Sequence, residues 1–397
     1  MAFITGQTPQ GNCGPVRYMG GGRYVCSPVP EQMHIRKHLV NQWFLFYARI
    51  EGDVGETVHI DLKWPAYDPQ RRESGTNGSD SFFTAAHECI FVSNDEISWR
   101  RIEEVQVDAQ NWVLHFSLTL TQPVCFVSVN FYYTRKMYAQ LRQALSASPF
   151  ITETTIGKSW DGQDIPLFIA TDRTIPADQK KIIYLQGGQH CSEFSGPHTL
   201  DAMLRYLASG LDGAADLLRR YEFHIVPVLS MAGWANGAQE HYGVKNPNRD
   251  WEEFELPEPR AVDAYLRSLR DKPVMLLDLH NGWTDYINDG AAITVMKDLP
   301  EAILAEQMRF AEMLISQCDN LAPGRIWHNL STPSIFKGYA QKHYGLGFTM
   351  EFSRYSIYDR SEGRRVPLSH ARYHRFGRQL AHVIDDFLSS GDTIFRR

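Results

Sequence analysis

Short runs of alternating apolar and polar residues fill the first third of the chain. Apolar side chains stand at every second position of 58–64 and again of 114–120, a period of two that is typical of a strand with one buried face. Apolar runs at 43–47 and 124–131 predict two more strands, and clusters of Gly, Asn, Asp and Pro separate the runs. The pattern predicts an antiparallel β-sandwich over about residues 30–135, after an irregular arm rich in Gly and Pro.

From about residue 155 the pattern changes to buried strands that alternate with helices. Strands are expected at 165–170, 181–186, 223–229 and 274–279, and helices at 199–208, 259–270, 301–317 and 369–388. This alternation predicts an α/β fold whose mixed, mostly parallel sheet is covered by helices. A short helix at 137–145 and a linker at 146–149 divide the chain, so we expect domains at 1–146 and 147–397.

Composition agrees with two globular cores and excludes several classes of partner. The chain has 397 residues, 43% of them hydrophobic and 22% charged, which is ordinary for globular proteins. The net charge of −6 gives no reason to expect nucleic acid or an anionic membrane as partner. We see neither a signal peptide nor a membrane-spanning run. Six scattered cysteines without C-x-x-C pairs fit reduced thiols, so we expect a cytoplasmic protein.

His190 and Glu193 stand three residues apart, directly after the apolar run 182–185 and the glycines at 187 and 188. A helical pattern follows, so the pair lies on a strand-to-helix turn, where parallel sheets bind their ligands. Imidazole nitrogen and carboxylate oxygen are both good Zn²⁺ ligands. Taken alone, the pair also fits a surface turn with a solvated Glu.

A third ligand of this kind follows the buried strand at 274–279, which ends at His280. Together, His190, Glu193 and His280 would bind one Zn²⁺ per chain and leave the fourth tetrahedral position to water. The alternative for His280 is a strand-end histidine that bonds to nearby backbone.

Two further segments carry groups that such a site would need. Glu351 ends an apolar stretch, where a carboxylate beside a metal can serve as general base; the alternative is a surface pair with Arg354. Arg249 offers a planar fork that matches a carboxylate, and Asn248 adds amide donors beside it; the alternative is a polar loop.

These residues, in this order, resemble the zinc metallocarboxypeptidases of the carboxypeptidase A type. His190, Glu193 and His280 match that family's metal ligands, Asn248 and Arg249 match its pair for the substrate's terminal carboxylate, and Glu351 matches its catalytic glutamate. Upstream, the segments 42–46, 131–134 and 155–162 resemble the cytosolic carboxypeptidase subgroup, which also has a β-sandwich ahead of the catalytic domain. The resemblance implies a carboxypeptidase-like fold and a cytosolic zinc peptidase that removes residues, often glutamate, from peptide or protein C-termini.

One departure from the family concerns the loop at 230–241. The family usually has an Arg there that polarises the scissile carbonyl, whereas this loop has none, and Glu240 or His241 falls near the expected place. Loss of such a charge costs about 3 kcal/mol of transition-state binding. Either another group, such as His241 or Lys245, substitutes for it, or the substrate differs from a standard peptide C-terminus.

The substrate's terminal side chain is expected to meet the segment 334–339. The cytosolic subgroup tends to have a basic residue there, and Lys337 is close to that place, although direct counting puts Phe336 on it. Lys337 would attract an acidic side chain, and Phe336 would favour an apolar one. We expect Lys337 to contribute, and Tyr339 to close over the substrate.

The sequence thus predicts a zinc-dependent hydrolase in which Glu351 activates a water for attack on an amide carbonyl. Two alternatives stay open. One is a zinc-dependent deacylase or amidase that acts on N-acyl amino acids, favoured by the missing Arg. The other is a zinc-binding recognition protein without turnover, against which the presence of Glu351 argues.

Overall fold

The structure is a computed structural model that describes most of the chain. The described residues are 1–8, 10–28, 33–35, 38–40, 46–63, 86–236, 245–281, 292–296, 299–322, 326–329, 332–354 and 356–390. Several sequence predictions fall outside them, namely most of the strand at 43–47, Trp64, and both Glu240 and His241 of the loop that lacks the arginine.

The strands of the N-terminal region are β1 (Phe3–Thr5), β2 (Val16–Gly20), β3 (Arg23–Cys26), β4 (Met33–Ile35), β5 (His38–Val40), β6 (Tyr47–Glu51), β7 (Thr57–Lys63), β8 (Ile90–Ser93), β9 (Arg100–Arg101), β10 (Val105–Asp108), β11 (Val113–Thr119) and β12 (Val124–Val129), with the short helix η2 (Ala86–Cys89). The elements that follow are α2 (Arg135–Leu145), β13 (Ile151–Lys158), β14 (Asp164–Ala170), η3 (Ala177–Gln179), β15 (Lys181–Gly187), α3 (Ser195–Leu207), α4 (Asp212–Arg220), β16 (Tyr221–Val226), α5 (Met231–Ala235), η4 (Pro247–Arg249), α6 (Pro257–Ser268), β17 (Met275–Asn281), β18 (Ala292–Met296), α7 (Glu301–Gln317), β19 (Ile326–Asn329), α8 (Phe336–Tyr344), β20 (Gly347–Phe352), β21 (Ser356–Asp359), β22 (Arg364–Pro367) and α9 (His370–Ser389).

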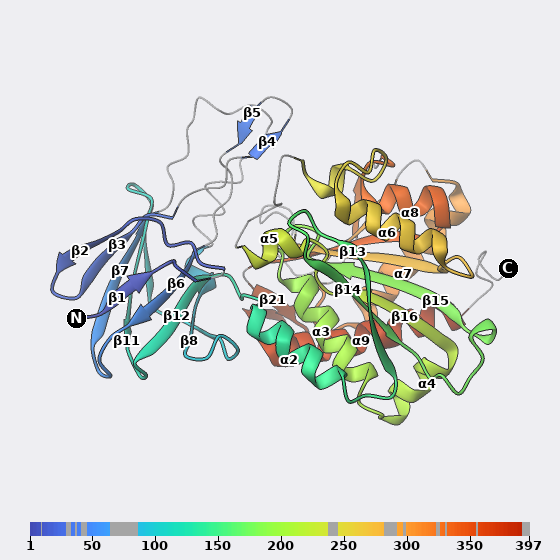
Figure 1. Ribbon diagram of the computed structural model, residues 1–397, viewed down its shortest axis with the longest axis horizontal. Helices are drawn as coiled ribbons and strands as arrows, with labels where there is room; N and C mark the ends of the chain where they lie inside the picture. The colour runs from blue at the N-terminus through green and yellow to red at the C-terminus, as the bar shows by residue number, and fades with distance from the viewer. Residues whose placement is uncertain are drawn as a thin grey trace.

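Two five-stranded sheets make up most of the N-terminal region, in the orders β1-β6-β12-β8-β9 and β10-β11-β7-β3-β2 (Figure 1). The strands expected from alternation at 58–64 and 114–120 are confirmed as β7 and β11, which pair antiparallel and bury every second side chain. One pairing departs from the expected antiparallel region, because β3 runs parallel to β7. We interpret these two sheets as the expected sandwich.

An eight-stranded mixed sheet is the centre of the rest of the chain, in the order β13-β14-β16-β15-β17-β20-β18-β19. Its four middle strands, β16, β15, β17 and β20, are all parallel to one another, whereas β13, β14 and β18 introduce antiparallel pairs. The middle strands are mostly apolar, and nearly all of their residues are buried, as expected of strands covered on both faces. The predicted α/β fold is confirmed.

Helices cover both faces of this sheet (Figure 1). On one face α3 packs on β15 and β17 and is itself covered by α9, and on the other face α8 packs on β17 and β20 while α6 packs on β13. The residues between β12 and α2 join the two parts of the chain, because the Tyr132 ring packs 4.3 Å from that of Phe194 and the Tyr133 hydroxyl donates to Asp201 at 2.7 Å.

The strand order changes direction at β15. The chain passes from β15 to β16 on one side, and from β16 it crosses back to β17 on the other side of β15. These two connections diverge at the carboxyl ends of the parallel strands, which is where open α/β sheets bind ligands. Any residues that follow β15, β17 and β20 therefore converge at this edge.

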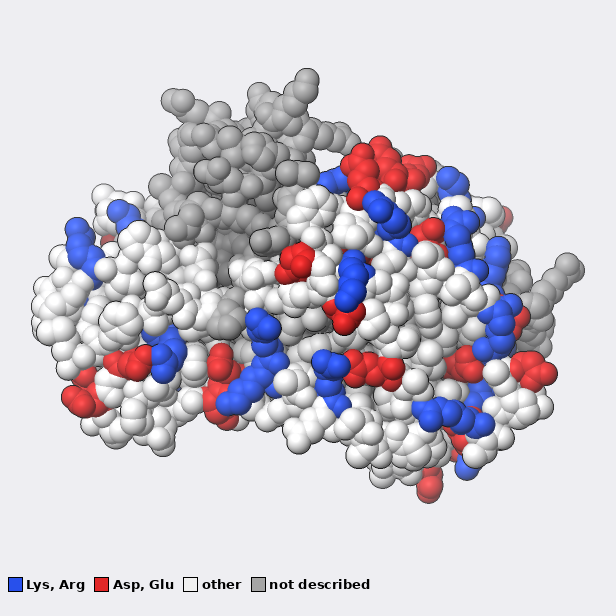
Figure 2. Space-filling view, viewed as in Figure 1, with Lys and Arg blue, Asp and Glu red and all other residues white. Residues whose placement is uncertain are grey.

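The face drawn in Figure 2 gives little indication of a highly charged partner. Figure 2 shows Lys and Arg side chains interspersed with Asp and Glu over the visible face. Among the described residues, no helix has the length and apolar composition to cross a membrane.

Candidate active site

The turn after β15 depends on two glycines that allow close backbone approach. Gly188 has φ +59°, which favours glycine. At Gly196, in the first turn of α3, an added Cβ would lie 2.6 Å from the Leu279 carbonyl oxygen and 3.3 Å from the Gly187 Cα. Only glycine therefore lets the start of α3 sit directly on the ends of β15 and β17, and this contact places Glu193 beside His280.

We expect Gly196→Ala to move α3 away from β17 and to lower stability by about 1–3 kcal/mol, because the new methyl group meets backbone that cannot yield. Metal affinity should fall with it, since Glu193 would move away from His280. Chemical denaturation and zinc titration would measure both effects. Gly213→Ala is the matched control: Gly213 is also the second residue of a helix, and its Cβ would meet only the ends of the Tyr206 and His382 side chains. Equal losses in both variants would contradict this role for Gly196.

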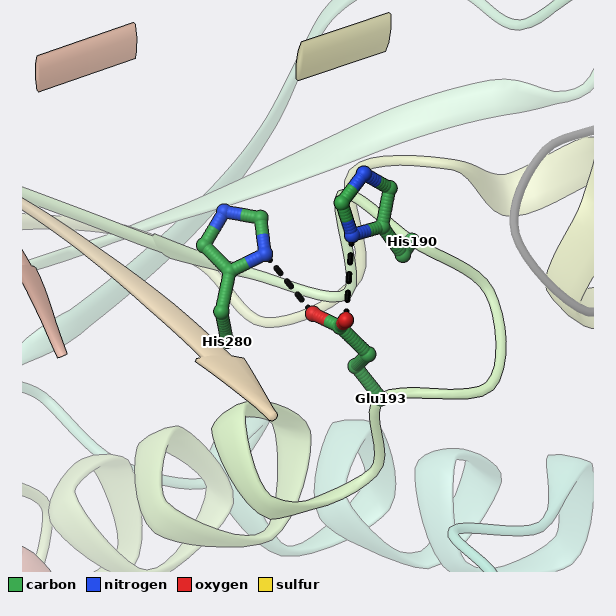
Figure 3. A group of neighbouring side chains, drawn as sticks. All are labelled: His190, Glu193 and His280. Carbon is green, nitrogen blue, oxygen red and sulfur yellow. Dashed lines mark hydrogen bonds and ion pairs between the residues drawn. The ribbon is translucent and has the colours of Figure 1, made fainter. Parts of the chain in front are cut away.

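His190, Glu193 and His280 meet at this edge of the sheet (Figure 3). The Glu193 carboxylate lies between the two rings, with Oε1 3.0 Å from His190 Nδ1 and Oε2 2.7 Å from His280 Nδ1. Potential ligand atoms of the three residues all lie within 4.8 Å of one another, and Glu193 and His280 are buried. The expectation that these three distant residues come together agrees with this geometry.

The outer nitrogen of each histidine faces an oxygen. His280 Nε2 lies 2.6 Å from Asp278 Oδ2, and His190 Nε2 lies 3.1 Å from Asn246 Oδ1. The Asn246 oxygen also accepts the Asn248 backbone N–H at 2.8 Å, which fixes the orientation of that amide. Both Nε2 atoms are therefore hydrogen-bond donors, and each ring can present Nδ1 as a ligand toward Glu193. Two imidazoles and a carboxylate with oriented outer contacts fit Zn²⁺ well.

The charges of this group depend on one another in the metal-free protein. Burial opposes ionisation of Glu193, but the two histidines hold its pKa well below the usual range. Burial also opposes a charge on His280, yet the carboxylates of Asp278 and Glu193 raise its pKa well above the usual value. Metal binding at His280 Nδ1 would therefore displace a proton.

Glu351 stands beside this group because β17 and β20 are neighbours. His280 and Glu351 are paired positions of the two parallel strands, so their side chains leave the sheet on the same face. Burial raises the pKa of Glu351 to about 7, and Glu193 contributes in the same direction against the nearby cations. The alternative pairing with Arg354 does not occur, since the Arg354 guanidinium is buried and donates to Glu193.

Asn248 and Arg249 lie on η4 (Pro247–Arg249). The Asn248 Nδ2 atom is 3.5 Å from His280 Nε2, and its Oδ1 atom accepts the Phe336 backbone N–H at 3.0 Å. Arg249 is exposed and donates to the Asn248 carbonyl at 2.6 Å. The positive charge of Arg249 also acts on Lys337. The structure thus brings Asn248 to the metal group, and it brings Arg249 within electrostatic reach of Lys337.

The first two residues of α8, Phe336 and Lys337, have different surroundings. Lys337 is only 3% exposed, and this burial lowers the pKa of its ammonium to about 8, although the Glu351 carboxylate opposes the change. Phe336 packs instead in the core, with its ring 4.8 Å from that of Trp251. Of the two residues considered for the substrate's side chain, Lys337 is the one whose charge reaches Glu351.

The structure does not place Tyr339 where the sequence analysis expected it. Tyr339 is fully buried, its hydroxyl donates to Asp263 at 2.7 Å, and its ring contacts Trp251 and Phe254. It is a core residue of α8, so the prediction that it closes over a substrate is wrong.

Lys245 forms ion pairs with three carboxylates. The sequence analysis considered it as a substitute for the missing arginine. Its ammonium lies 2.6 Å from Asp250 and 2.9 Å from Glu255, and it also pairs with Glu253. These carboxylates offset its charge. The other two residues considered there, Glu240 and His241, lie outside the described part of the chain.

Several contacts of the site escaped the sequence analysis. Gln189 is fully buried, donates to Asp278 at 3.1 Å and accepts the Trp251 indole N–H at 2.7 Å, so it links the outer contact of His280 to the segment that carries Arg249. Asn246 and Arg354 contact the ligands His190 and Glu193. The sequence offered one signal for Gln189 and Asn246. Gln189 stands next to His190, and Asn246 stands two residues before Asn248.

Comparison with known proteins agrees with this geometry. Residues 137–235, which include His190 and Glu193, match the zinc carboxypeptidase family. A metallo-carboxypeptidase from Burkholderia cenocepacia is similar in structure, with 18% sequence identity and a TM-score of 0.76 over 98% of this chain and 100% of the other. One from Pseudomonas aeruginosa has 18% identity and a TM-score of 0.74 over 97% and 100% of the two chains.

Other comparisons are more limited. The carboxypeptidase A of Helicoverpa armigera has 13% identity and a TM-score of 0.50, and the match covers 65% of this chain and 73% of the other. No curated protein sequence matches the chain. At these identities the solved structures establish the fold, and the resemblance to zinc carboxypeptidases that the sequence predicts is confirmed by the family match.

Proposed function

We propose, on the premise that this chain contains a zinc carboxypeptidase domain and is a zinc-dependent hydrolase, that it removes single residues from the C-termini of peptides or proteins. The observation that carries the proposal is the meeting of three kinds of group at one sheet edge. These are the His190, Glu193 and His280 group, the carboxylate of Glu351 on the neighbouring strand, and the η4 segment, in which Asn248 reaches His280 and Arg249 follows it.

Each group has one task in this reaction. His190, Glu193 and His280 would hold Zn²⁺, which when bound supplies a Lewis acid that polarises a carbonyl and lowers the pKa of water. Arg249 binds the terminal carboxylate of the substrate through its planar fork, and Asn248 adds an amide donor. Together they orient the last peptide bond toward Glu351.

Glu351 moves the proton. As a carboxylate it takes a proton from the attacking water, and as a carboxylic acid it returns that proton to the leaving amine. A general base works best when its pKa lies near the operating pH, and burial brings the Glu351 pKa to about 7. This carboxylate is therefore able both to accept and to release a proton at neutral pH.

Lys337 favours an acidic terminal residue. It is a buried ammonium within electrostatic reach of both Glu351 and Arg249, and a buried cation attracts an anionic side chain more strongly than a solvated one does. A C-terminal glutamate would offer one carboxylate to Arg249 and a second one to Lys337. The preference thus follows from two neighbouring cations, and it agrees with the glutamate preference that the resemblance implies.

The test is hydrolysis of a peptide panel that differs only in the last residue, alongside N-acyl amino acids, with and without a chelator. Chelator-sensitive release of the last residue from peptides would support the proposal. Hydrolysis of N-acyl amino acids alone would favour a deacylase, and zinc binding without any turnover would favour a recognition protein. The compound (2-guanidinoethylmercapto)succinic acid, present in the Pseudomonas aeruginosa structure, is a practical ligand for a competition assay.

We expect Lys337→Met to lower kcat/KM for peptides that end in Glu by about tenfold or more relative to those that end in Phe, because the substrate's carboxylate loses its cation. In the wild type the preference for Glu should also weaken as pH rises past about 8, since Lys337 is charged only below its pKa. Steady-state kinetics on both peptides would measure the ratio.

Lys342→Met is the matched control for this change. Lys342 lies on the same helix but is exposed, with its ammonium 3.7 Å from Glu252. An unchanged Glu-to-Phe ratio in the Lys337 variant would remove Lys337 from the specificity pocket.

We also propose that the activity is cytoplasmic and that the two-domain division falls at residue 146. None of the six cysteines forms a disulfide, and all are buried, which suits a reducing compartment. Helix α2 ends at Leu145, so the proposed division falls directly after this helix. Cell fractionation, and expression of residues 147–397 alone, would test these two points.

A further inference from the structure

A buried arginine donates hydrogen bonds to the turn that carries Glu193. Arg354 follows β20 and is 6% exposed. Its Nη2 atom donates to Glu193 Oε1 at 3.2 Å, and its Nη1 atom donates to the backbone carbonyl and to the hydroxyl of Ser192, each at 3.2 Å. One guanidinium thus contacts the carboxylate of a candidate metal ligand and the main chain of the residue before it.

We propose that Arg354 is a positioning residue for the metal centre, which fixes the carboxylate of Glu193 in its place between the two histidines. This inference rests on the metal set proposed above. Glu193 Oε1 accepts a hydrogen bond from Arg354 and lies 3.0 Å from His190 Nδ1, whereas Oε2 lies 2.7 Å from His280 Nδ1. The contact makes the two carboxylate oxygens unequal, because it holds Oε1.

The fork shape of the side chain is needed for this task. A guanidinium donates in two fixed directions at once, so that its bond to Ser192 holds the fork while the other arm holds Glu193. A lysine at this position would keep the charge, but its ammonium is a single point that cannot reproduce both bonds in the same plane. The two fixed donor directions of Arg354, and not its positive charge alone, are therefore what a lysine could not replace.

The same segment also carries the general base. Glu351 and Arg354 are three residues apart, and β20 ends between them at Phe352. A displacement of this segment would move the base and the support of the metal ligand together. The buried hydrogen bonds of Arg354 therefore help to fix the distance between Glu351 and Glu193.

The experiment measures metal binding without any substrate. Arg354→Lys and Arg354→Met would be titrated with zinc against a chromogenic chelator, their cobalt forms compared by visible absorption, and the metal-free proteins melted thermally. We expect zinc affinity to fall 10- to 100-fold in both variants, the usual effect of losing an outer contact to a metal ligand. The cobalt absorption bands should shift, because the carboxylate changes its mode of binding.

Arg365→Met is the matched control, since Arg365 donates to the neighbouring Ser353 at 3.0 Å and has intermediate burial. Arg354→Met breaks a buried ion pair and is expected to lower the melting temperature, so Arg354→Lys, which keeps the charge, decides the question if the Met variant does not fold. Wild-type zinc affinity and cobalt bands in Arg354→Lys would overturn the proposal, even if stability falls. A wild-type protein that binds no zinc would overturn the proposed function as well, which separates the two failures.

Discussion

The Glu351→Gln variant is expected to bind zinc as tightly as the wild type and to lose about 10²–10⁴-fold in kcat, the usual contribution of a general acid–base group. Glutamine has nearly the same shape but cannot accept and return a proton. Glu351 is also not one of the three residues whose ligand atoms converge. The rate would be measured on the best peptide of the panel, and zinc content by elemental analysis.

Glu258→Gln is a suitable control for this change. Glu258 is a second carboxylate whose pKa is raised by burial, but it lies on α6 and accepts the Trp160 backbone N–H at 2.9 Å. Its variant should keep normal turnover. If Glu351→Gln turned over at a rate near that of the wild type, the assigned base would be wrong, whatever its zinc content.

The pH dependence provides a second test of the same residue. A base must be ionised, so kcat/KM should fall as pH drops below the pKa of Glu351. Burial raises that pKa to about 7 in the metal-free protein, and the charge of bound zinc would favour the carboxylate and lower the value. The acid limb should therefore have its midpoint below about 7, and Glu351→Gln should lack it.

The candidate site could be predicted from the sequence where it depends on strand ends. His280 and Glu351 each follow an apolar run long enough to be a buried strand, and His190 and Glu193 follow a third. Because β15, β17 and β20 are parallel neighbours, all these residues leave the sheet at the same edge. Apolar periodicity was sufficient to place them together.

Other parts of the site depend on how distant segments pack, which periodicity does not report. Two residues that are two positions apart on a helix face in different directions, so the orientation of α8 decides that Lys337 approaches Glu351 while Tyr339 enters the core. Arg354 meets Glu193 only because the end of β20 lies against the turn after β15. Likewise, the parallel pairing of β3 with β7 depends on the path of the intervening chain, not on local pattern.

The largest effect on the metal centre is expected from His280→Ala. This change removes one of three ligands, so zinc affinity should fall by more than the 10- to 100-fold that loss of an outer contact costs. A ligand that binds only the folded state stabilises it, so added zinc should raise the melting temperature of the wild type and leave that of the variant nearly unchanged. Elemental analysis after dialysis would give the stoichiometry, with one Zn²⁺ per wild-type chain.

Two further variants separate metal loss from structural damage. Asp278 is fully buried and its Oδ2 atom lies 2.6 Å from His280 Nε2. His280→Ala therefore also removes a hydrogen-bond donor to this buried carboxylate and should destabilise the metal-free protein. His280→Gln keeps an N–H donor at that position and should lose zinc with less loss of stability. His198→Gln is the control, because His198 is also a buried histidine but its ring nitrogen faces the Phe131 carbonyl at 3.2 Å, outside the metal group. It should retain one Zn²⁺, and a His280→Gln protein with stoichiometric zinc would show that His280 is not a ligand.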